Sequence, residues 1–312
     1  MEFTHLHWNS TFSFLEAIWT PKEIIEKAKE LWFKNIAITD FGGMYWAITL
    51  YEAAKKNDIN PIIGTELWFV LDIKWYNKIE DIWNICFLGK NIEWYNSLMK
   101  IVSHANQEGI AWKPKLDIEM IWKYNKWIIA FMWWKSSWIW KMIKRSEPEE
   151  KILEIIEMIQ DKLGEENVFL EIIAKDETLD EDIKKINRKI LEIAEKSWIK
   201  CVVNNIYHYI NKSDKEAWEM ALAIKDWYKM YDKNRRKPKW DFHIMTREEI
   251  EDILLSNWYT EWQIKERIEN NNNIANNINI EIPMWQTLFP NYQTPENIKE
   301  IYDNVKSNLI SE

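Results

Sequence analysis

Apolar residues recur along this chain in two alternating patterns. Short β-branched runs predict buried strands at residues 36–39, 62–66, 82–88, 128–132, 168–173 and 199–204. Between these runs, apolar positions three and four residues apart predict helices at residues 21–31, 47–56, 92–107, 149–163 and 179–196. This repeated strand–helix order predicts a parallel α/β sheet, most economically closed as a barrel.

The pattern changes after Ser213, where apolar spacing becomes helical without intervening strands. Further helices are predicted at residues 216–224, 247–255, 261–277 and 295–309. Pro283, Pro290 and Pro295 punctuate the stretch before the last of these helices, which predicts a linker there. A basic run at residues 229–239 is predicted to be a surface loop; it could contact a phosphate backbone, although such a run is usually a solvated loop.

Polar residues lie at the ends of several predicted strands. Asp40 follows the first run, Glu66 ends the second, and His208 lies shortly after the last. His5 and His7 alternate along a further short strand, predicted at residues 4–7, and so project to one face. Because the carboxyl ends of parallel strands meet at one edge of a sheet, these side chains are expected to converge. Imidazoles with carboxylates from two neighbouring strands predict a pocket suited to zinc or manganese.

Composition narrows the class of protein. The 312 residues are 47% hydrophobic and 29% charged, which is typical of a soluble globular protein. The longest apolar run, residues 127–134, is too short to span a bilayer, and the first residues do not resemble a signal peptide. Two cysteines, Cys86 and Cys201, argue against a disulfide framework and fit a reducing cytoplasm. The net charge of −9 disfavours non-specific DNA binding by this segment alone.

Tryptophan and glycine are present in unusual proportion. The chain has 22 Trp and 6 Gly, whereas average usage would give roughly 22 glycines at this length. Trp32 and Trp198 follow predicted helices, and Trp46 and Trp258 lie in turn-like sequence, all contexts that favour glycine. We therefore hypothesise that UGA is read as glycine in the source gene, so that many of these tryptophans stand for glycine. The alternative is a genuinely tryptophan-rich protein.

The strand-end residues resemble the motifs of the PHP domain, which appear as His5-Leu6-His7, Thr39-Asp40, Ile63-Gly64-Thr65-Glu66 and Asn204-Asn205-Ile206-Tyr207-His208-Tyr209. More narrowly, the chain resembles the PHP domain at the N-terminus of bacterial DNA polymerase III alpha subunits. Further stretches fall in that family's order, namely Phe12-Ser13-Phe14-Leu15, Leu50-Tyr51-Glu52-Ala53-Ala54-Lys55, Lys113-Pro114-Lys115-Leu116-Asp117 and Phe289-Pro290. In that family the residues matching Trp32, Trp46, Trp94 and Trp198 are usually glycine.

The resemblance implies an α/β fold, namely a distorted (β/α)7 PHP barrel followed by a helical extension. It implies a PHP barrel core at residues 1–212 and a helical extension of the PHP region at residues 213–282. Residues 283–312 would then be a linker and the start of the polymerase core. The sequence is accordingly expected to be an N-terminal fragment of a longer chain.

PHP enzymes use a metal cluster to activate water for phosphoester hydrolysis, and the resemblance maps its ligand positions onto this chain. Metal-binding side chains are retained at His7, Asp40, Glu66 and His208. Other side chains stand at Asn9, Phe41, Asn84, Trp134 and Asn205. Neutral amides bind transition metals poorly and phenylalanine has no lone pair, so we expect a remnant, hydrogen-bonded cleft without catalytic residues. One zinc or manganese ion at this remnant site is the alternative.

The resemblance also implies a part in DNA replication, within a DNA-directed DNA polymerase (a nucleotidyltransferase). The magnesium-binding carboxylates of the polymerase core follow residue 312 in family order, so this segment is not expected to polymerise DNA by itself. Its expected role is structural and cytoplasmic, away from membranes. The expected partners are the rest of the alpha chain, the proofreading exonuclease subunit and, through the full-length protein, DNA. The alternatives are a metal-dependent PHP phosphoesterase and a 3′–5′ exonuclease.

Overall fold

The computed structural model describes residues 3–70, 83–108, 115–123, 128–132, 137–284 and 296–311. The chain forms two compact units, Met1–Glu281 and Ile282–Glu312. The first unit contains the sheet and the candidate site. The described part of the second unit consists mainly of helix α11 (Glu296–Ser311).

Among the described residues, the first unit holds a seven-stranded sheet in the order β1-β2-β3-β5-β6-β7, with β4 paired to β2. The strands are β1 (Asn35–Ile38), β2 (Asn60–Phe69), β3 (Trp83–Gly89), β4 (Lys115–Leu116), β5 (Ile128–Met132), β6 (Val168–Ile173) and β7 (Cys201–Asn204). Most strand pairs are parallel, but β3 is antiparallel to both β2 and β5. The prediction of a wholly parallel sheet is therefore wrong at β3. Consecutive strands such as β2 and β3 can pair antiparallel without a crossover helix, and an apolar run does not encode its direction.

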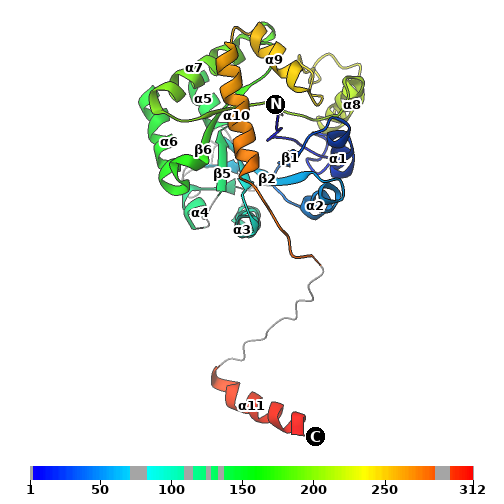
Figure 1. Cartoon of the computed structure of the whole chain (residues 1–312), viewed down its shortest axis with the longest axis vertical. Helices are drawn as coiled ribbons and strands as arrows, with labels where there is room; N and C mark the ends of the chain where they lie inside the picture. Colours follow the sequence, from blue (N-terminus) through cyan, green and yellow to red (C-terminus); the bar gives the residue numbers. More distant parts are fainter. Residues whose placement is uncertain are drawn as a thin grey trace. The chain divides into compact units, whose positions relative to one another are not determined.

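The helices of the first unit lie around the outside of the curled sheet (Figure 1). They are α1 (Pro21–Glu30), α2 (Ala47–Lys56), α3 (Ile92–Glu108), α4 (Ile118–Lys123), α5 (Trp138–Lys144), α6 (Glu149–Leu163), α7 (Glu181–Ser197), α8 (Lys215–Lys225), α9 (Arg247–Ser256) and α10 (Glu261–Asn276). The longer predicted helices are confirmed, whereas α4 and α5, of 6 and 7 residues, are too short to show a helical period. None of the helices in the described residues has the length and apolar character needed to cross a membrane.

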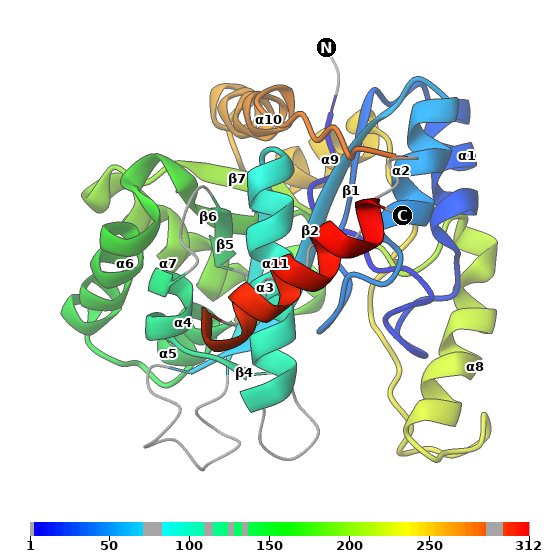
Figure 2. The same cartoon turned by 90° about the horizontal axis from the view of Figure 1, so that it is seen from below.

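Side-chain amides of α10 connect the N-terminal segment to β7. His5 forms a single parallel bridge with Ile36, so the strand predicted at residues 4–7 is reduced to one bridged pair. On the other side, Asn271 accepts a hydrogen bond from the Val203 nitrogen (3.0 Å) and donates to the carbonyl oxygens of Val203 (2.6 Å) and Thr4 (3.1 Å). Helix α10 lies beside β7 in Figure 2. Asn271 thus links β7 to the N-terminal segment through its side chain, in addition to the backbone hydrogen bond from the Asn9 nitrogen to the Tyr207 carbonyl oxygen (3.3 Å).

Four tryptophans adopt the left-handed backbone conformation directly after helices. Their φ angles lie between 59° and 71°, and their side chains are 87–95% exposed. These residues are Trp32, Trp198, Trp227 and Trp258. A side chain at such a φ is disfavoured, whereas glycine is not. The glycine-type backbone expected at Trp32, Trp198 and Trp258 is present. Trp46 lies in a turn but with a φ of −84°, and Trp94 lies within α3; both side chains are buried.

Candidate functional site

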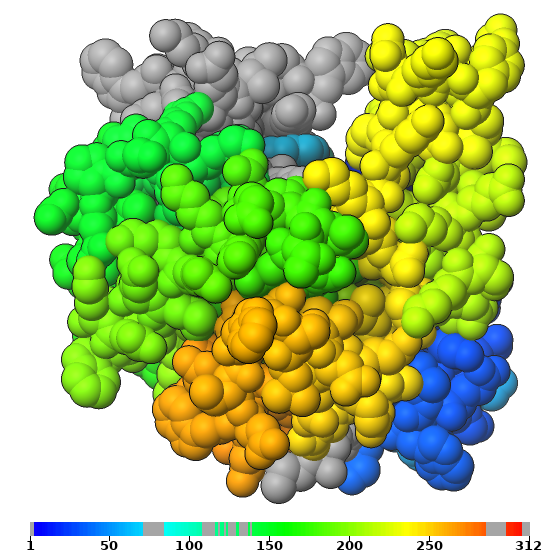
Figure 3. Space-filling view, turned by 90° about the horizontal axis from the view of Figure 1, so that it is seen from above, coloured from blue at the N-terminus to red at the C-terminus, as the bar shows by residue number. Residues whose placement is uncertain are grey.

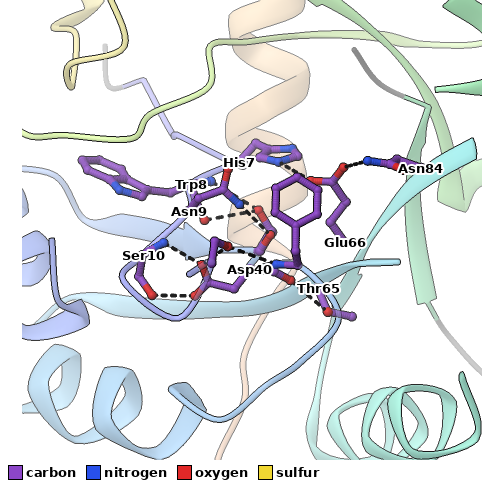
Figure 4. A network of polar contacts seen from close by, with 11 residues as sticks. His7, Trp8, Asn9, Ser10, Asp40, Thr65, Glu66 and Asn84 are labelled. Carbon is purple, nitrogen blue, oxygen red and sulfur yellow. Dashed lines mark hydrogen bonds and ion pairs between the residues drawn. The ribbon is translucent and has the colours of Figure 1, made fainter. Parts of the chain in front are cut away.

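The ends of β1 and β2 bring two of the predicted carboxylates to one place (Figure 4). Asp40 lies two residues past β1, and Glu66 lies within β2. The Glu66 nitrogen donates to the Asp40 carbonyl oxygen (3.0 Å), and the Gly42 nitrogen donates to the Glu66 carbonyl oxygen (2.8 Å). A parallel bridge between Phe41 and Glu66 continues this pairing. The backbone after β1 is therefore fixed in register with β2.

His7 and Asn84 hold the Glu66 carboxylate from two sides. His7 Nε2 lies 3.5 Å from Glu66 Oε2, and Asn84 Nδ2 donates to Glu66 Oε1 at 2.5 Å. All three side chains are buried. Burial raises the pKa of Glu66 above its ordinary value, and the contacts with His7 and Asn84 oppose that rise. Asn84 and Glu66 both stand at ligand positions that the resemblance indicated, the first with a changed side chain. Asn84 thus serves as a hydrogen-bond donor to Glu66.

Two serines engage the carboxylate of Asp40. Ser10 donates from its backbone nitrogen to Oδ1 (2.7 Å) and from its hydroxyl to Oδ2 (2.5 Å), and the Ser13 hydroxyl donates to Oδ1 (2.5 Å). Burial raises the pKa of Asp40 to about 6, and these hydrogen bonds limit the rise. Neither serine stood out in the sequence, because a hydroxyl in an irregular segment has no periodic signal. Ser13 does lie within the Phe12-Ser13-Phe14-Leu15 motif, which was the available clue.

His208 packs between aromatic rings. Its imidazole is stacked on Trp218, with ring centroids 5.1 Å apart and planes 14° apart, and is tilted against Phe242 at 5.1 Å. Burial lowers the pKa of His208 well below its ordinary value, and the charge of Lys175 lowers it further. A neutral imidazole in an aromatic setting is the result.

His5 also lies among aromatic rings, although its spacing from His7 predicted a shared face. Its ring centroid lies 4.7 Å from that of Phe3, 4.8 Å from that of Phe33 and 4.6 Å from that of Tyr207. Burial lowers the pKa of His5 to about 3. His5 therefore belongs to the aromatic core. Of the two histidines in the first motif, His7 is the one that contacts a carboxylate, that of Glu66. The irregular backbone here, with one bridged residue, removes the strict alternation that a strand would impose.

Two other substituted positions hold buried asparagines whose amide nitrogens are used within the protein. Asn9 Nδ2 donates to the Thr39 carbonyl oxygen (3.2 Å), and Asn205 Nδ2 donates to Met245 Sδ (2.8 Å). Their Oδ1 atoms accept no hydrogen bond from the described residues. These side chains favour hydrogen bonding over transition-metal coordination. Trp134, the remaining position with a changed side chain besides Phe41, lies outside the described residues.

Phe41 lies in the mouth of the barrel. Its ring is stacked against Trp68 with centroids 6.3 Å apart. A cavity of about 380 Å³ is lined there by Phe41, Asn9, Asn84 and His208. Of the four side chains expected to converge, His208 lines this cavity, whereas His7, Asp40 and Glu66 are not among its lining residues.

Two buried charged residues close to the site were not singled out in the sequence. Glu171 lies on β6. Burial raises the pKa of Glu171 well above its ordinary value, the nearby Asn204 side chain opposes that rise, and the charge of Glu66 adds to it. Lys175 lies two residues past β6 and donates to the carbonyl oxygen of Asp241. The sequence did offer a signal for Glu171, because it is an ionisable residue inside the apolar run that forms β6. Ionisable side chains are rarely buried without a partner or a function.

The retained ligand positions do not assemble a metal centre. In the part of the chain that the structure describes, no group of three or more His, Cys, Asp or Glu side chains is arranged to hold a metal ion. The carboxylates of Asp40 and Glu66 accept hydrogen bonds from within the protein, and His208 faces aromatic rings. A zinc or manganese centre needs several ligands directed at one point. The described residues therefore do not fit the metal cluster that the resemblance implied.

A family model for the PHP domain matches residues 5–175, which is more than half of the chain. The chain belongs to the PHP domain family. The α/β sheet with outer helices confirms the expected fold class of this PHP domain. The retained motif positions at residues 7, 40 and 66 lie inside the matched range, whereas His208 lies beyond it.

Two relatives of this PHP domain carry the same name. The chain is 28% identical to the DNA polymerase III subunit alpha of Borreliella burgdorferi, over 94% of this chain and 25% of that protein. It is 29% identical to the DNA polymerase III subunit alpha of Deinococcus radiodurans, over 95% of this chain and 22% of that protein. The chain thus spans about a quarter of the length of the curated relatives it matches. A solved structure of a putative metal-dependent phosphoesterase from Bifidobacterium adolescentis is 12% identical, with a TM-score of 0.41, and the match covers 81% of this chain and 95% of that one.

Proposed function

We propose that this chain is the N-terminal PHP region of a replicative DNA polymerase III alpha subunit. Within that protein it acts as a structural and partner-docking module whose metal site is degraded. In this proposal residues 1–212 are the barrel core, residues 213–282 its helical extension, and residues 283–312 the linker and the start of the polymerase core. The named relatives and the motif order along almost the whole chain support this identity.

One observation carries the structural role: both carboxylate oxygens of Asp40, and Oε1 of Glu66, already accept hydrogen bonds from donors of the same chain. Asp40 accepts three hydrogen bonds from Ser10 and Ser13, and Glu66 accepts one from Asn84. Hydrogen bonds to a charged group contribute about 1.5–3 kcal/mol each. A metal ion would have to replace them in a buried site that offers too few further ligands. The same contacts fix the barrel mouth without a metal.

The proposed partners are the rest of the alpha chain and the proofreading exonuclease subunit, with DNA bound through the full-length protein. Helix α11 supports the first of these. It exposes Ile298, Ile301 and Val305, spaced three and four residues apart, at 42%, 65% and 54% of their surface. An apolar stripe of this kind on a helix normally packs against other protein. Magnesium belongs in this proposal to the polymerase core of the full-length protein.

Metal analysis tests the degraded site. The purified chain, dialysed against zinc and manganese and then desalted, is expected to retain less than one metal ion per chain, and to show no metal-dependent 3′–5′ nuclease activity. Two or three ions per chain, or a nuclease activity that is lost in Asp40→Ala, would restore the phosphoesterase or exonuclease function instead.

Copurification tests the docking role. The proofreading exonuclease subunit from the same organism, expressed with this chain, is expected to elute with it in size-exclusion chromatography. Separate elution at micromolar concentrations of both proteins would contradict docking by this module while leaving the metal result unaffected.

A further inference from the structure

The loop after α8 forms a wall of the barrel mouth. Residues 236–240 line the cavity beside His208, and the segment around them stands out, in yellow, from the rest of the unit in Figure 3. Residues 225–239 contain five lysines and two arginines but only two aspartates. This local excess of positive charge contrasts with the net charge of −9 of the whole chain. At about 0.1 M salt, charges more than roughly 10 Å away are largely screened, so the local excess governs what approaches this loop.

The two arginines of the loop anchor it to the protein. Arg235 Nη1 lies 2.7 Å from Glu219 Oε2, and both side chains are mostly buried. Arg236 Nε donates to Asp226 at 2.5 Å, and its Nη1 lies 3.5 Å from Glu16. These contacts fix the loop against α8 and the N-terminal segment. They also leave the lysines as the cations that face solvent.

Exposed tyrosines alternate with those lysines. Tyr231 is 77% exposed and Tyr228 is 42% exposed. Lys229 lies between them, with Nζ 5.6 Å from the centre of the Tyr231 ring. Lys233 and Lys237 are exposed and form no ion pair with any described residue. We name this set, Tyr228, Lys229, Tyr231, Lys233 and Lys237, the tyrosine–lysine surface.

We propose that the tyrosine–lysine surface binds single-stranded nucleic acid without sequence preference. Non-specific single-strand binders combine a cationic path for the phosphates with aromatic rings on which bases stack. Both components are present here on a loop that arginine–carboxylate pairs hold in place, so little ordering is needed on binding. A protein partner is a poorer match, because lysine is depleted in the cores of protein interfaces. This contact is separate from the remnant metal site and from the docking role proposed above.

Fluorescence anisotropy with labelled oligo(dT) tests the stacking contribution. The whole chain is expected to bind at low salt, and Tyr231→Ala is expected to weaken binding roughly 5- to 100-fold, since one stacked base contributes about 1–3 kcal/mol. Tyr45→Ala is the matched control, because Tyr45 is 75% exposed and lies outside this loop, and it is expected to leave binding unchanged. Trp227→Gly is also expected to retain binding.

The salt dependence tests the lysines. Each phosphate contact adds about 0.7 to the slope of log K against log salt for a single strand, so Lys229→Gln with Lys233→Gln is expected to lower the slope by about 1.4. The control pair is Lys22→Gln with Lys56→Gln, both exposed elsewhere, which should leave the slope unchanged. Oligo(dT) and oligo(U) are expected to bind alike, because stacking and phosphate contacts do not distinguish DNA from RNA.

The proposal would be overturned if the chain did not bind oligo(dT) at low salt; the surface would then be left to a protein partner. It would also be overturned if Trp227→Gly alone lost binding, or if the Tyr45 and Tyr231 substitutions weakened binding equally. Tighter binding of duplex than of single-stranded DNA, insensitive to Tyr231→Ala, would likewise show that bases do not stack there.

Discussion

Asn84 donates a hydrogen bond to Glu66, with Nδ2 2.5 Å from Oε1, at one of the positions where the sequence resemblance indicated a changed metal ligand. The amide therefore turns toward the Glu66 carboxylate and gives its Oε1 atom a hydrogen-bond donor within the protein. Both side chains are buried, at 5% and 0% exposure, so water does not replace this contact if it is lost. This contact therefore links β3 to β2 through their side chains at the barrel mouth.

Asn84→Ala is expected to lower the free energy of unfolding by about 1–3 kcal/mol, because Glu66 loses a buried hydrogen-bond partner. Urea denaturation followed by circular dichroism measures this change. Asn96→Ala, at an exposed position on α3, is the control and should change stability by less than about 0.5 kcal/mol. Equal effects of the two substitutions would mean that the Asn84 contact does not stabilise the fold.

Asp40→Ala is expected to lower the free energy of unfolding by about 1–3 kcal/mol, because the Ser10 nitrogen and two serine hydroxyls lose their acceptor. His7→Ala is expected to act in the same direction through the loss of its contact with Glu66. Thermal and urea unfolding report both effects. Asp161→Ala, exposed on α6, serves as control. If added zinc stabilises the wild-type chain by more than it stabilises Asp40→Ala, a metal role for Asp40 would replace this explanation.

Trp198→Gly is expected to raise the free energy of unfolding by about 1 kcal/mol, because glycine adopts the left-handed backbone there without the penalty paid by other residues. The exposed indole of Trp198 makes little packing contribution that could be lost. Trp46→Gly is expected to have the opposite sign, because Trp46 is buried and its φ of −84° is unstrained. Stabilisation by Trp46→Gly would contradict the packing that the structure assigns to it.

Mass spectrometry of the protein from its native host tests the reading of UGA as glycine. The peptide that contains residue 198 is expected to have the mass of the glycine form. The left-handed conformations at Trp32, Trp198, Trp227 and Trp258 motivate this expectation, since four such residues after helices are unusual. A tryptophan-containing mass at residue 198 would sink the recoding hypothesis and leave a strained, tryptophan-rich protein.

Lys175→Met is expected to stabilise the protein increasingly as the pH falls from about 10 to 7. Burial lowers the pKa of Lys175 well below the ordinary value of 10.5. The negative charge of Asp241 opposes this lowering, and the positive charge of Lys215 adds to it. Between about pH 10 and the lowered pKa of Lys175 in the folded chain, the unfolded chain therefore binds a proton that the folded chain does not. Over that range the wild type loses up to about 1.4 kcal/mol of stability per pH unit as the pH falls. Methionine removes this dependence while filling a similar volume.

Urea unfolding at about pH 7, 8.5 and 10 measures the difference between wild type and Lys175→Met. Lys185→Met, at an exposed position on α7, is the control and should show no pH-dependent difference. Parallel stability curves for the wild type and Lys175→Met would show that Lys175 is not held neutral by the fold.

The sequence alone determined the local elements of this PHP domain. Helix α6 and strand β6 begin and end where the apolar periods predicted, because such periods are properties of neighbouring residues. The motif residues also placed Asp40 and Glu66 at adjacent strand ends, since the order of β1 and β2 follows the chain. The basic run marked the loop after α8, but the sequence did not indicate which of its cations form ion pairs with the rest of the protein.

Only the tertiary structure determined which polar side chains form hydrogen bonds with each other. Asp40 receives its donors from Ser10 and Ser13, 30 and 27 residues earlier, and Asn271 bonds to Val203 across 68 residues. A hydroxyl or amide side chain can serve many partners and carries no periodic signal, so its choice depends on which backbone the fold brings within about 3 Å. The antiparallel direction of β3 was likewise decided by its pairing, with β2 on one side and β5 on the other, and not by its own apolar run.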